Sequence, residues 1–397
     1  MMKRILPVVL LACLCANIAT AGWYDVEWTR RIKITCDPDS LGTGVPDSLG
    51  GDYALLQGFP LLLTDLPDAV YDSALTTGAD LRFTAQNGVT IIPHETVYYN
   101  ATTDSCEIWV RVGTLTPSFN YIYLYYGNAT ASAPTLAVKQ STWDDYEMVY
   151  HYDNTPALGM LLDSSPNERD ALAQAAGAQT WDADDRVASP IRRGWHYNQN
   201  VNTAVYGGMI PEVDWAVFAW VSMDTFGTDF LMQTSPCSAI LATGASDESH
   251  DILVKTDGYC GSITQGVDFR YRGTLGTADE FHHYAFVMSS EDSLVTVYYD
   301  GDAYAFSTNA EPGERIKPYG FNGNLEPIGV GSVQYLQDGT GVYTDSMHGI
   351  VDEFAVRVFA DPADHPSAHF YKTLFRNQAT PATFVAFATQ EECWSCV

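Results

Sequence analysis

In the stretch Cys106-Glu107-Ile108-Trp109-Val110-Arg111-Val112, aliphatic side chains alternate with charged or aromatic ones. Successive side chains of a β-strand point to opposite faces, so Ile108, Val110 and Val112 would share one face and the residues between them the other. This alternation is typical of a strand with one face in a hydrophobic core. The stretch therefore predicts β-structure in the first half of the chain.

Similar short stretches recur along the chain between turn-forming residues. They are Tyr121 to Tyr126, Trp215 to Val221, Tyr284 to Met288 and Leu294 to Tyr299. The last two flank a short loop and predict a hairpin, and Asp300-Gly301 then supplies a pair that tolerates positive φ. Many short strands spaced by turns favour sandwiches or jelly rolls. We expect an all-β fold in which the one helix lies near Ser367 to Asn377.

Residues 1–21 have the composition of a secretory signal peptide. Lys3-Arg4 gives a basic start, Ile5 to Ala16 is apolar, and Ala19-Thr20-Ala21 supplies the small residues of a cleavage site. An alternative interpretation makes Cys13 the modified cysteine of a lipoprotein. The apolar run is shorter than the roughly 20 residues that a membrane helix needs. We expect a secreted or cell-surface protein without a transmembrane segment in the mature chain.

Charge and length restrict the class of protein further. The formal net charge of −29 would repel phosphate backbones, so we expect no nucleic-acid partner. At roughly 150 residues per domain, 397 residues suggest two or three domains. The small, polar stretch Ala129 to Pro134 predicts a linker. We therefore expect β-sandwich domains over residues 22–140 and 141–390, followed by a cysteine-containing tail over residues 391–397.

Cysteine usage also fits an exported chain. After the predicted signal peptide there remain Cys36, Cys106, Cys237, Cys260, Cys393 and Cys396. An even number in an exported protein favours disulfides, although the sequence leaves their connectivity open. Proximity within the predicted domains suggests Cys36–Cys106 and Cys237–Cys260. Cys393 and Cys396 predict a small terminal disulfide or a site of intermolecular bonding.

The first half resembles a known family. The elements that carry the resemblance are, in order, Gly78–Thr84, Asn87-Gly88, His94-Glu95, Ile108–Val112 and Tyr123–Asn128. This order is similar to the bacterial and archaeal domain of unknown function 2341, over about residues 22–140. The resemblance implies an exported β-rich module and brings no established chemistry. From the residues themselves, Asp80, Arg82 and Glu95 predict an ion-pair cluster across strands.

The second half resembles the laminin-G and concanavalin-like sandwiches. The matching elements are Val149–Tyr152, Leu162–Ser165, Phe218–Val221, Phe281–Phe286, Tyr298–Gly301 and Gly349–Phe354. The resemblance implies a jelly roll over residues 141–390. It also implies a lectin-like mode of action, in which loops and aromatic side chains bind a ligand. We expect His282 and His283 to be core or turn residues.

Asp352 is the candidate metal ligand. In a strand over residues 350–358 it shares a face with four apolar residues, and a lone carboxylate there is costly to bury unless it is paired or metal-bound. Related sandwiches hold a structural calcium with an Asp at this place, so the resemblance implies calcium here. Asp163, in the turn Asp163-Ser164-Ser165, is the candidate second ligand. The alternative is that Asp352 accepts backbone hydrogen bonds and binds no ion.

Catalytic motifs are missing from the sequence. Glu212-Val213-Asp214 begins like the Glu-x-Asp-x-x-Glu strand of family-16 glucanases, but Val217 stands where the last Glu belongs. Neither a His-Glu-x-x-His helix, nor a phosphate loop, nor a Gly-x-Ser-x-Gly elbow is present. We therefore expect no catalytic residues. A glycoside hydrolase built from distant segments stays open as the last alternative.

Two functions without catalysis compete. The first is binding of a carbohydrate or a surface protein, with Trp181, Trp195 and Tyr197 as candidate ligand-binding residues because aromatic faces stack on sugars. The second is a structural subunit of an extracellular filament or envelope layer. Self-assembly of that kind would use exposed sheet edges and the terminal cysteine pair.

Overall fold

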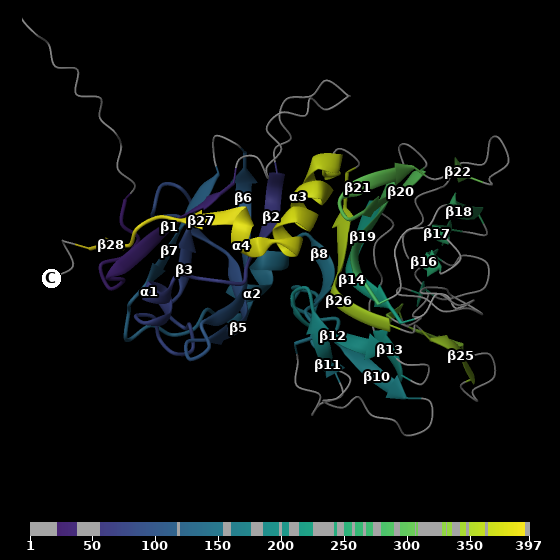
Figure 1. The fold of residues 1–397 in the computed structure, drawn as a ribbon, viewed down its shortest axis with the longest axis horizontal. Helices are drawn as coiled ribbons and strands as arrows, with labels where there is room; N and C mark the ends of the chain where they lie inside the picture. The colour runs from purple at the N-terminus through teal and green to yellow at the C-terminus, as the bar shows by residue number, and fades with distance from the viewer. Residues whose placement is uncertain are drawn as a thin grey trace, which may run out of the picture.

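The computed structural model describes residues 22–37, 56–116, 120–153, 160–175, 186–197, 201–205, 214–224, 279–289, 294–305, 349–361 and 364–393, with further short strands between residues 242 and 346. These residues form antiparallel sheets and a few short helices, so the fold is all-β as predicted (Figure 1). No helix among them is long and apolar enough to cross a membrane. The predicted signal peptide lies outside the described residues.

The first sheet unites the two ends of the described chain. Its strands are β27 (Val385–Phe387), β1 (Arg30–Cys36), β7 (Tyr121–Tyr126), β3 (Arg82–Thr84) and β4 (Ile91–Ile92), with β28 (Glu391–Glu392) also on β1. Figure 1 shows the yellow β27 and β28 beside the purple β1. The predicted domain division placed residues up to 390 in the second domain and the rest in a tail, and it did not anticipate this pairing.

A three-stranded sheet packs with the first one around a shared core. It contains β2 (Leu56–Leu63), β6 (Ser105–Leu115) and β5 (His94–Asn100). In β6 the side chains of Ile108, Val110 and Val112 are buried, as the alternation predicted. The opposite face is buried as well, since Glu107 and Trp109 are each 1% exposed. Residues from the second half of the chain cover that face.

The predicted Cys36–Cys106 disulfide is wrong. Cys36 ends β1 and Cys106 lies in β6, so the two belong to different sheets, and both are free, buried thiols. Burial raises the pKa of each thiol to about 12. Cys393 is disulfide-bonded. Cys237, Cys396 and the side chain of Cys260 lie outside the described residues.

The second half is built on an eight-stranded sheet. Its strands are β11 (Arg186–Ser189), β12 (Arg192–Tyr197), β26 (Gly349–Phe359), β14 (Asp214–Met223), β19 (Phe281–Ser289), β20 (Leu294–Tyr299) and β21 (Asp302–Ala305), with β8 (Tyr146–Tyr150) also on β26. The predicted hairpin is confirmed, because β19 and β20 pair antiparallel. Asp300 and Gly301 follow with φ of 48° and 79°.

Two further sheets lie in the second half. The larger one contains β22 (Ser307–Thr308), β18 (Val267–Arg272), β17 (Tyr259–Thr264), β16 (His250–Lys255), β15 (Ala242–Thr243), β23 (Ile328–Val330), β13 (Val201–Val205), β10 (Ala171–Ala175) and β9 (Met160–Leu161). The smaller one pairs β24 (Ser332–Tyr335) with β25 (Val342–Ser346). The concanavalin-like topology of this half stays a prediction.

Helix α3 (Ala368–Ala379) lies where the sequence predicted a helix, and it joins the two halves. The Asn377 amide accepts the Leu62 N–H at 2.7 Å and donates to the Leu62 carbonyl at 3.1 Å, both in β2. The next residue, Gln378, accepts the indole N–H of Trp220 in β14 at 2.7 Å. The other helices are α1 (Asp68–Tyr71), α2 (Leu136–Gln140), η1 (Ser141–Trp143) and α4 (Pro381–Phe384).

Aromatic contacts continue the same connection. Phe370 and Tyr371, neighbours on α3, contact Phe59 of β2 and Phe218 of β14 with ring centroids 5.6 and 5.9 Å apart. One cluster of buried apolar residues therefore extends from the first sheet through α3 to the eight-stranded sheet. The two halves share a core, which fixes how side chains at their junction meet.

Candidate functional site

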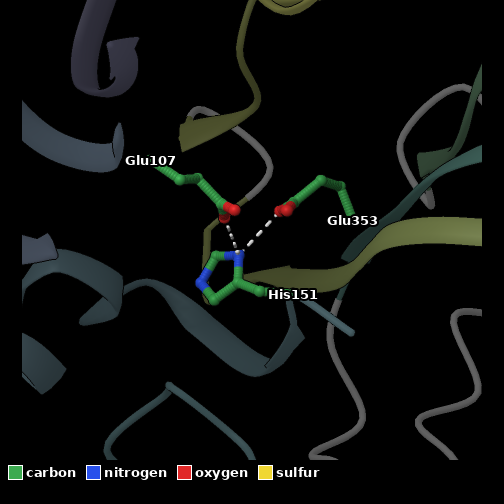
Figure 2. Close-up of side chains that lie close together, drawn as sticks. All are labelled: Glu107, His151 and Glu353. Atoms are coloured by element: carbon green, nitrogen blue, oxygen red, sulfur yellow. Dashed lines mark hydrogen bonds and ion pairs between the residues drawn. The ribbon is translucent and has the colours of Figure 1, made fainter. Parts of the chain in front are cut away.

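Four ionisable side chains meet at the junction of the two halves. Glu95 comes from β5, Glu107 from β6, His151 directly follows β8, and Glu353 lies in β26. Figure 2 shows the carboxylates of Glu107 and Glu353 on either side of one nitrogen of the His151 ring. We call these four residues the junction cluster.

A β-bulge turns Glu353 into the junction. In the pairing of β14 with β26, Phe218 faces Ala355 but Trp220 faces Asp352, so one residue of β14 opposes two of β26. Glu353 occupies this irregularity with a φ of 49°. A bulge of this kind redirects a side chain out of the regular alternation. Asp352 and Glu353 are both buried, as are the residues on both faces of β26 from 351 to 357.

Both nitrogens of the His151 ring face carboxylates. Nδ1 lies 2.7 Å from Glu353 Oε2 and 3.7 Å from Glu107 Oε1. Nε2 lies 3.3 Å from Glu95 Oε2. The Trp109 ring stacks on the imidazole with centroids 5.7 Å apart, and the Trp143 ring lies tilted at 5.4 Å. The imidazole is thus held by three carboxylates and two indoles.

Neighbouring donors fix Glu95 in place. Its Oε2 accepts the indole N–H of Trp143 at 2.7 Å, and its Oε1 accepts the Ser164 hydroxyl at 2.9 Å. The predicted ion-pair cluster of Glu95 with Asp80 and Arg82 is wrong. In the described residues Asp80 accepts backbone N–H groups and Arg82 donates to backbone carbonyls.

Carboxylate oxygens outnumber the donors in this cluster. Trp109 Nε1 donates to Glu107 Oε1 at 3.3 Å, and His151 is the ring partner of Glu353 Oε2. The remaining oxygens, Glu107 Oε2 and Glu353 Oε1, are buried and have no hydrogen-bond partner among the described residues. The neighbouring Asp352 leaves its Oδ1 in the same condition. Buried polar atoms are normally satisfied, so three unsatisfied oxygens in adjacent residues call for an explanation.

The ionisation of the cluster follows from this crowding. Burial lowers the pKa of His151, but the charges of and hydrogen bonds with Glu353 and Glu95 outweigh it, so that pKa lies well above the usual value. Burial and the Glu353 carboxylate raise the pKa of Glu107 well above its usual range. Burial raises the pKa of Glu353 despite His151, whereas the hydrogen bonds of Glu95 lower its pKa against burial. The cluster thus holds a cationic imidazole beside an ionised Glu95, while burial favours the protonated form of Glu107, which hydrogen-bonds to Glu353.

Burial limits the chemistry open to the cluster. The side chains of Glu107, Glu353 and His151 are 1%, 4% and 5% exposed, and Glu95 is 13% exposed. A polymeric substrate would not reach His151 or Glu107 at this exposure. The arrangement can share protons among its members or hold a small cation.

The predicted calcium ligand Asp352 is buried but separate from the other predicted ligand. Its Oδ2 accepts the Ser189 hydroxyl at 2.7 Å and the Ile191 N–H at 3.3 Å. The side chain of Asp163 forms its hydrogen bonds within the segment of residues 149–169 and shares no described contact with Asp352. The structure does not bring the two together, and calcium at Asp352 stays a prediction.

Asp163 itself is fully occupied by its own loop. Its Oδ1 accepts the N–H groups of Val149 at 2.8 Å and Ser165 at 2.9 Å. Its Oδ2 accepts the Ser165 hydroxyl at 2.6 Å and the Arg169 N–H at 2.8 Å. Four donors satisfy the two oxygens, so Asp163 organises the loop after β8.

The candidate ligand-binding aromatics are core residues where they are described. Trp195 is 2% exposed and its indole donates to the Tyr152 carbonyl at 2.9 Å. Tyr197 is 0% exposed, with its hydroxyl 3.2 Å from that of Tyr152. Both side chains pack in the core, and their predicted role in ligand binding stays a prediction. Trp181 lies outside the described residues.

A different aromatic group lies on the outer surface of the first sheet. Its members are Trp23, Tyr24, Trp28, Tyr121, Tyr123 and Tyr125, packed against one another away from the main core. The Arg31 guanidinium lies 4.4 Å from the ring centre of Tyr123, and the Lys33 ammonium 3.8 Å from that of Tyr121. Trp23, Tyr24, Tyr121 and Lys33 are partly exposed. We call this group the outer aromatic face.

Sequence reasoning missed both features. Glu107, His151 and Glu353 come from strands far apart in the chain, and the strand pattern assigned Glu107 to the face away from the core. One signal was present. Trp109 on the same face as Glu107 is a large apolar side chain that needs cover.

Comparisons with solved structures give distant matches. Domain 4 of an extracellular arabinanase from Geobacillus stearothermophilus, in complex with arabinotriose, is 15% identical with a TM-score of 0.40, over 58% of this chain and 98% of that one. A pentraxin from Limulus polyphemus is 16% identical with a TM-score of 0.29, over 43% of this chain and 73% of that one. A sialidase from Trypanosoma rangeli is 12% identical with a TM-score of 0.34, and the matched part spans 42% of its length.

The sequence comparisons concern the first half. No curated protein matches the chain at a significant level. The family described as "Domain of unknown function (DUF2341)" matches residues 77–159. The match confirms the predicted family resemblance and runs past the predicted boundary at residue 140. The matched segment contains Glu95, Glu107 and His151, so three of the four junction residues lie in the part of the chain that is similar to this family.

Proposed function

We propose that this protein is an exported, non-catalytic binding protein that recognises carbohydrate through the outer aromatic face. The observation that carries the proposal is the partly exposed part of this face, which consists of Trp23, Tyr24 and Tyr121 with Lys33 of β1 over the Tyr121 ring, while Tyr123 and Tyr125 lie buried beneath them. Sugar C–H groups pack on aromatic rings, and polar neighbours then set the orientation of the ligand.

Two cationic side chains lie on this face of an acidic chain. The chain has a formal net charge of −29, yet Arg31 and Lys33 both lie over tyrosine rings on this face. Arg31 is also bound to Glu391 of β28 at 2.7 Å, which holds the guanidinium in place. Lys33 and Tyr121 stay partly exposed and are the two side chains best placed to contact a ligand.

The non-catalytic part of the proposal is supported by where acids and bases lie. General acid–base catalysis needs a titratable group within hydrogen-bond reach of the substrate. In the described part of the chain, the one group of three carboxylates around an imidazole is the junction cluster, and its members are buried and bonded to one another. Export is supported by the signal-like composition of residues 1–21.

A carbohydrate-binding assay tests the proposal. The exported chain would be screened on a glycan array and by affinity electrophoresis in polysaccharide gels. We expect retention by at least one glycan, and Tyr121→Ala should weaken it at least about tenfold, the equivalent of roughly 1.4 kcal/mol. Tyr304→Ala removes a partly exposed tyrosine from β21 in the other half and is the matched control.

Two results would contradict the proposal. The first is the absence of retention by any glycan at high protein concentration. The second is an equal loss of binding in Tyr121→Ala and Tyr304→Ala, because it would mean that the outer aromatic face does not contact the ligand.

A further inference from the structure

We propose that the junction cluster is a binding site for one first-row divalent transition-metal ion, with a carboxylate oxygen of Glu107, the Nδ1 atom of His151 and a carboxylate oxygen of Glu353 as ligands. This inference is independent of carbohydrate binding. It concerns a site inside the molecule, whereas the proposed function uses its surface.

The positions of the donor atoms fit such an ion. One ligand atom from each of the three residues lies within 4.8 Å of the others. Metal–ligand bonds of about 2.0–2.2 Å in a tetrahedral site place neighbouring ligand atoms roughly 3.3–3.6 Å apart. The His151 Nδ1 atom lies 2.7 Å from Glu353 and 3.7 Å from Glu107, on either side of that value. Because the three ligand atoms lie within 4.8 Å of one another, movements of about 1 Å in the glutamate side chains would complete the geometry.

The unsatisfied oxygens supply an independent reason. Glu107 and Glu353 each keep one buried oxygen without a hydrogen-bond partner, and both residues are less than 10% exposed. An unpaired carboxylate in the interior costs several kcal/mol or else stays protonated. A divalent cation between these carboxylates would bind their unsatisfied oxygens and balance their negative charge. Asp163, a buried carboxylate with four donors, shows that this chain can satisfy such a group where no cation is needed.

The environment of His151 has the form found around metal-bound histidines. Such histidines bind the metal through one ring nitrogen and donate the other N–H to a carboxylate, which fixes the ring and its tautomer. Here Glu95 lies 3.3 Å from Nε2 and is itself held by Trp143 and Ser164. Nδ1 is thereby directed at Glu107 and Glu353. Glu95 is a positioning residue and not a ligand.

The donor set selects the class of metal. One imidazole nitrogen with carboxylate oxygens suits zinc and its first-row neighbours, whereas calcium takes six to eight oxygen ligands. The three ligands come from β6, β26 and the end of β8, so a bound ion would join the two halves of the chain. Glu95, 13% exposed, is the most exposed member of the cluster.

Zinc is the probe for the test. The full exported chain would be stripped with a chelator under non-reducing conditions, which keep Cys393 in its disulfide. Bound metal would be counted by elemental analysis after zinc is added back, and affinity measured by calorimetric titration. Thermal unfolding would follow in parallel, because a ligand that binds only the folded state raises the unfolding temperature. Calcium and manganese serve as comparison ions.

Three variants make the test specific. Glu107→Gln and Glu353→Gln keep the shape of the side chains and remove one anionic ligand each. Glu147→Gln is the matched control, since Glu147 is also mostly buried, is bound to Arg169 at 2.8 Å and contributes no atom to the cluster. Each variant is compared with its own metal-free form, so a change in basal stability does not obscure the zinc effect.

We expect one zinc per chain, a raised unfolding temperature, and at least a tenfold weaker affinity in Glu107→Gln and Glu353→Gln but not in Glu147→Gln. The proposal is overturned if the chelated wild-type chain binds no zinc, or if all three variants bind it as tightly as the wild type. Stronger binding of calcium than of zinc would also contradict the assigned donor set. If one glutamine variant does not fold, the other variant and the number of zinc ions bound per wild-type chain still show whether the junction cluster binds zinc.

Discussion

Two buried acidic sites in this chain differ in how many hydrogen bonds their carboxylate oxygens accept. Asp163 receives four hydrogen bonds from its own loop, two to each oxygen. Glu107 and Glu353, on opposite sides of His151, receive fewer donors and each leave one oxygen unsatisfied. Burial and chemical type are the same, so the number of donors distinguishes a structural carboxylate from a candidate ligand.

This comparison also corrects how the sequence was interpreted. Asp163 was predicted as a calcium ligand because it lies in an Asp-Ser-Ser turn, and the structure shows the donors of that turn in full use. The sequence does not predict Glu107 as a site residue, because it lies in a regular strand. An acidic residue in a turn is often satisfied by nearby backbone N–H groups, whereas one on a covered strand face has no such donors.

The largest expected effect comes from removing the histidine of the junction cluster. His151→Ala leaves Glu353 and Glu95 without their cationic partner, and removal of one partner from a buried pair costs about 3–5 kcal/mol. The control is His196→Ala, because His196 and Asp224 also pair closely, at 2.6 Å, but are 34% and 36% exposed. That variant should lose less than about 1 kcal/mol. Denaturant unfolding of the metal-free proteins measures both, and equal losses would contradict the account.

The next largest effect tests the satisfied site. Asp163→Asn keeps the size of the side chain but turns an accepting oxygen into a donor that faces backbone N–H groups. Loss of these charge-assisted bonds should lower the free energy of unfolding by about 2–3 kcal/mol, measured in denaturant. Added zinc or calcium should not change the difference in free energy of unfolding between this variant and the wild type. If the difference changes with added metal, Asp163 is a metal ligand after all.

The β-strands were predictable because their signal is local. The alternation in β6, the β19–β20 hairpin and the Asp300-Gly301 turn all depend on neighbouring residues, and each lies where the sequence indicated. The position of α3 was predicted in the same way.

The junction cluster was not predictable in the same way. Its residues come from positions 95, 107, 151 and 353, and Glu353 lies at a bulge that breaks the alternation of β26. Strand periodicity assigns a face but does not say what covers it. The same limit explains Trp195 and Tyr197, which a polar sequence neighbourhood placed near a ligand and tertiary packing buries.

A smaller effect is expected at Asp352, which has two donors to Oδ2 but none to Oδ1 and so lies between Asp163 and the two glutamates in the number of hydrogen bonds that it accepts. Ser189→Ala removes one of the two donors to its Oδ2 atom, and one lost hydrogen bond to a buried carboxyl should cost about 1–2 kcal/mol. Thermal unfolding of the variant in chelator measures this cost. Recovery of the loss on addition of calcium, and not of zinc, would sharpen the comparison by showing that Asp352 binds its own ion. A loss of less than about 0.3 kcal/mol would show that the Ser189 bond does not matter to folding.

The smallest expected effect is that of Glu107→Gln without metal. Removing a buried carboxylate with too few donors is often neutral or stabilising, so the free energy of unfolding should stay within about 1 kcal/mol of the wild type or rise. The amide oxygen can still accept the Trp109 indole N–H. A loss as large as that of His151→Ala would mean that the Glu107 charge is already balanced without an added cation.

The most direct measurement is a crystal structure of the zinc-soaked protein with anomalous data at the zinc absorption edge. We predict one strong anomalous peak about 2.0–2.2 Å from the Glu107 carboxylate, His151 Nδ1 and the Glu353 carboxylate, with Glu95 still bonded to Nε2. A zinc peak only at surface residues, with the Glu107 and Glu353 oxygens bound to ordered water instead, would contradict the account.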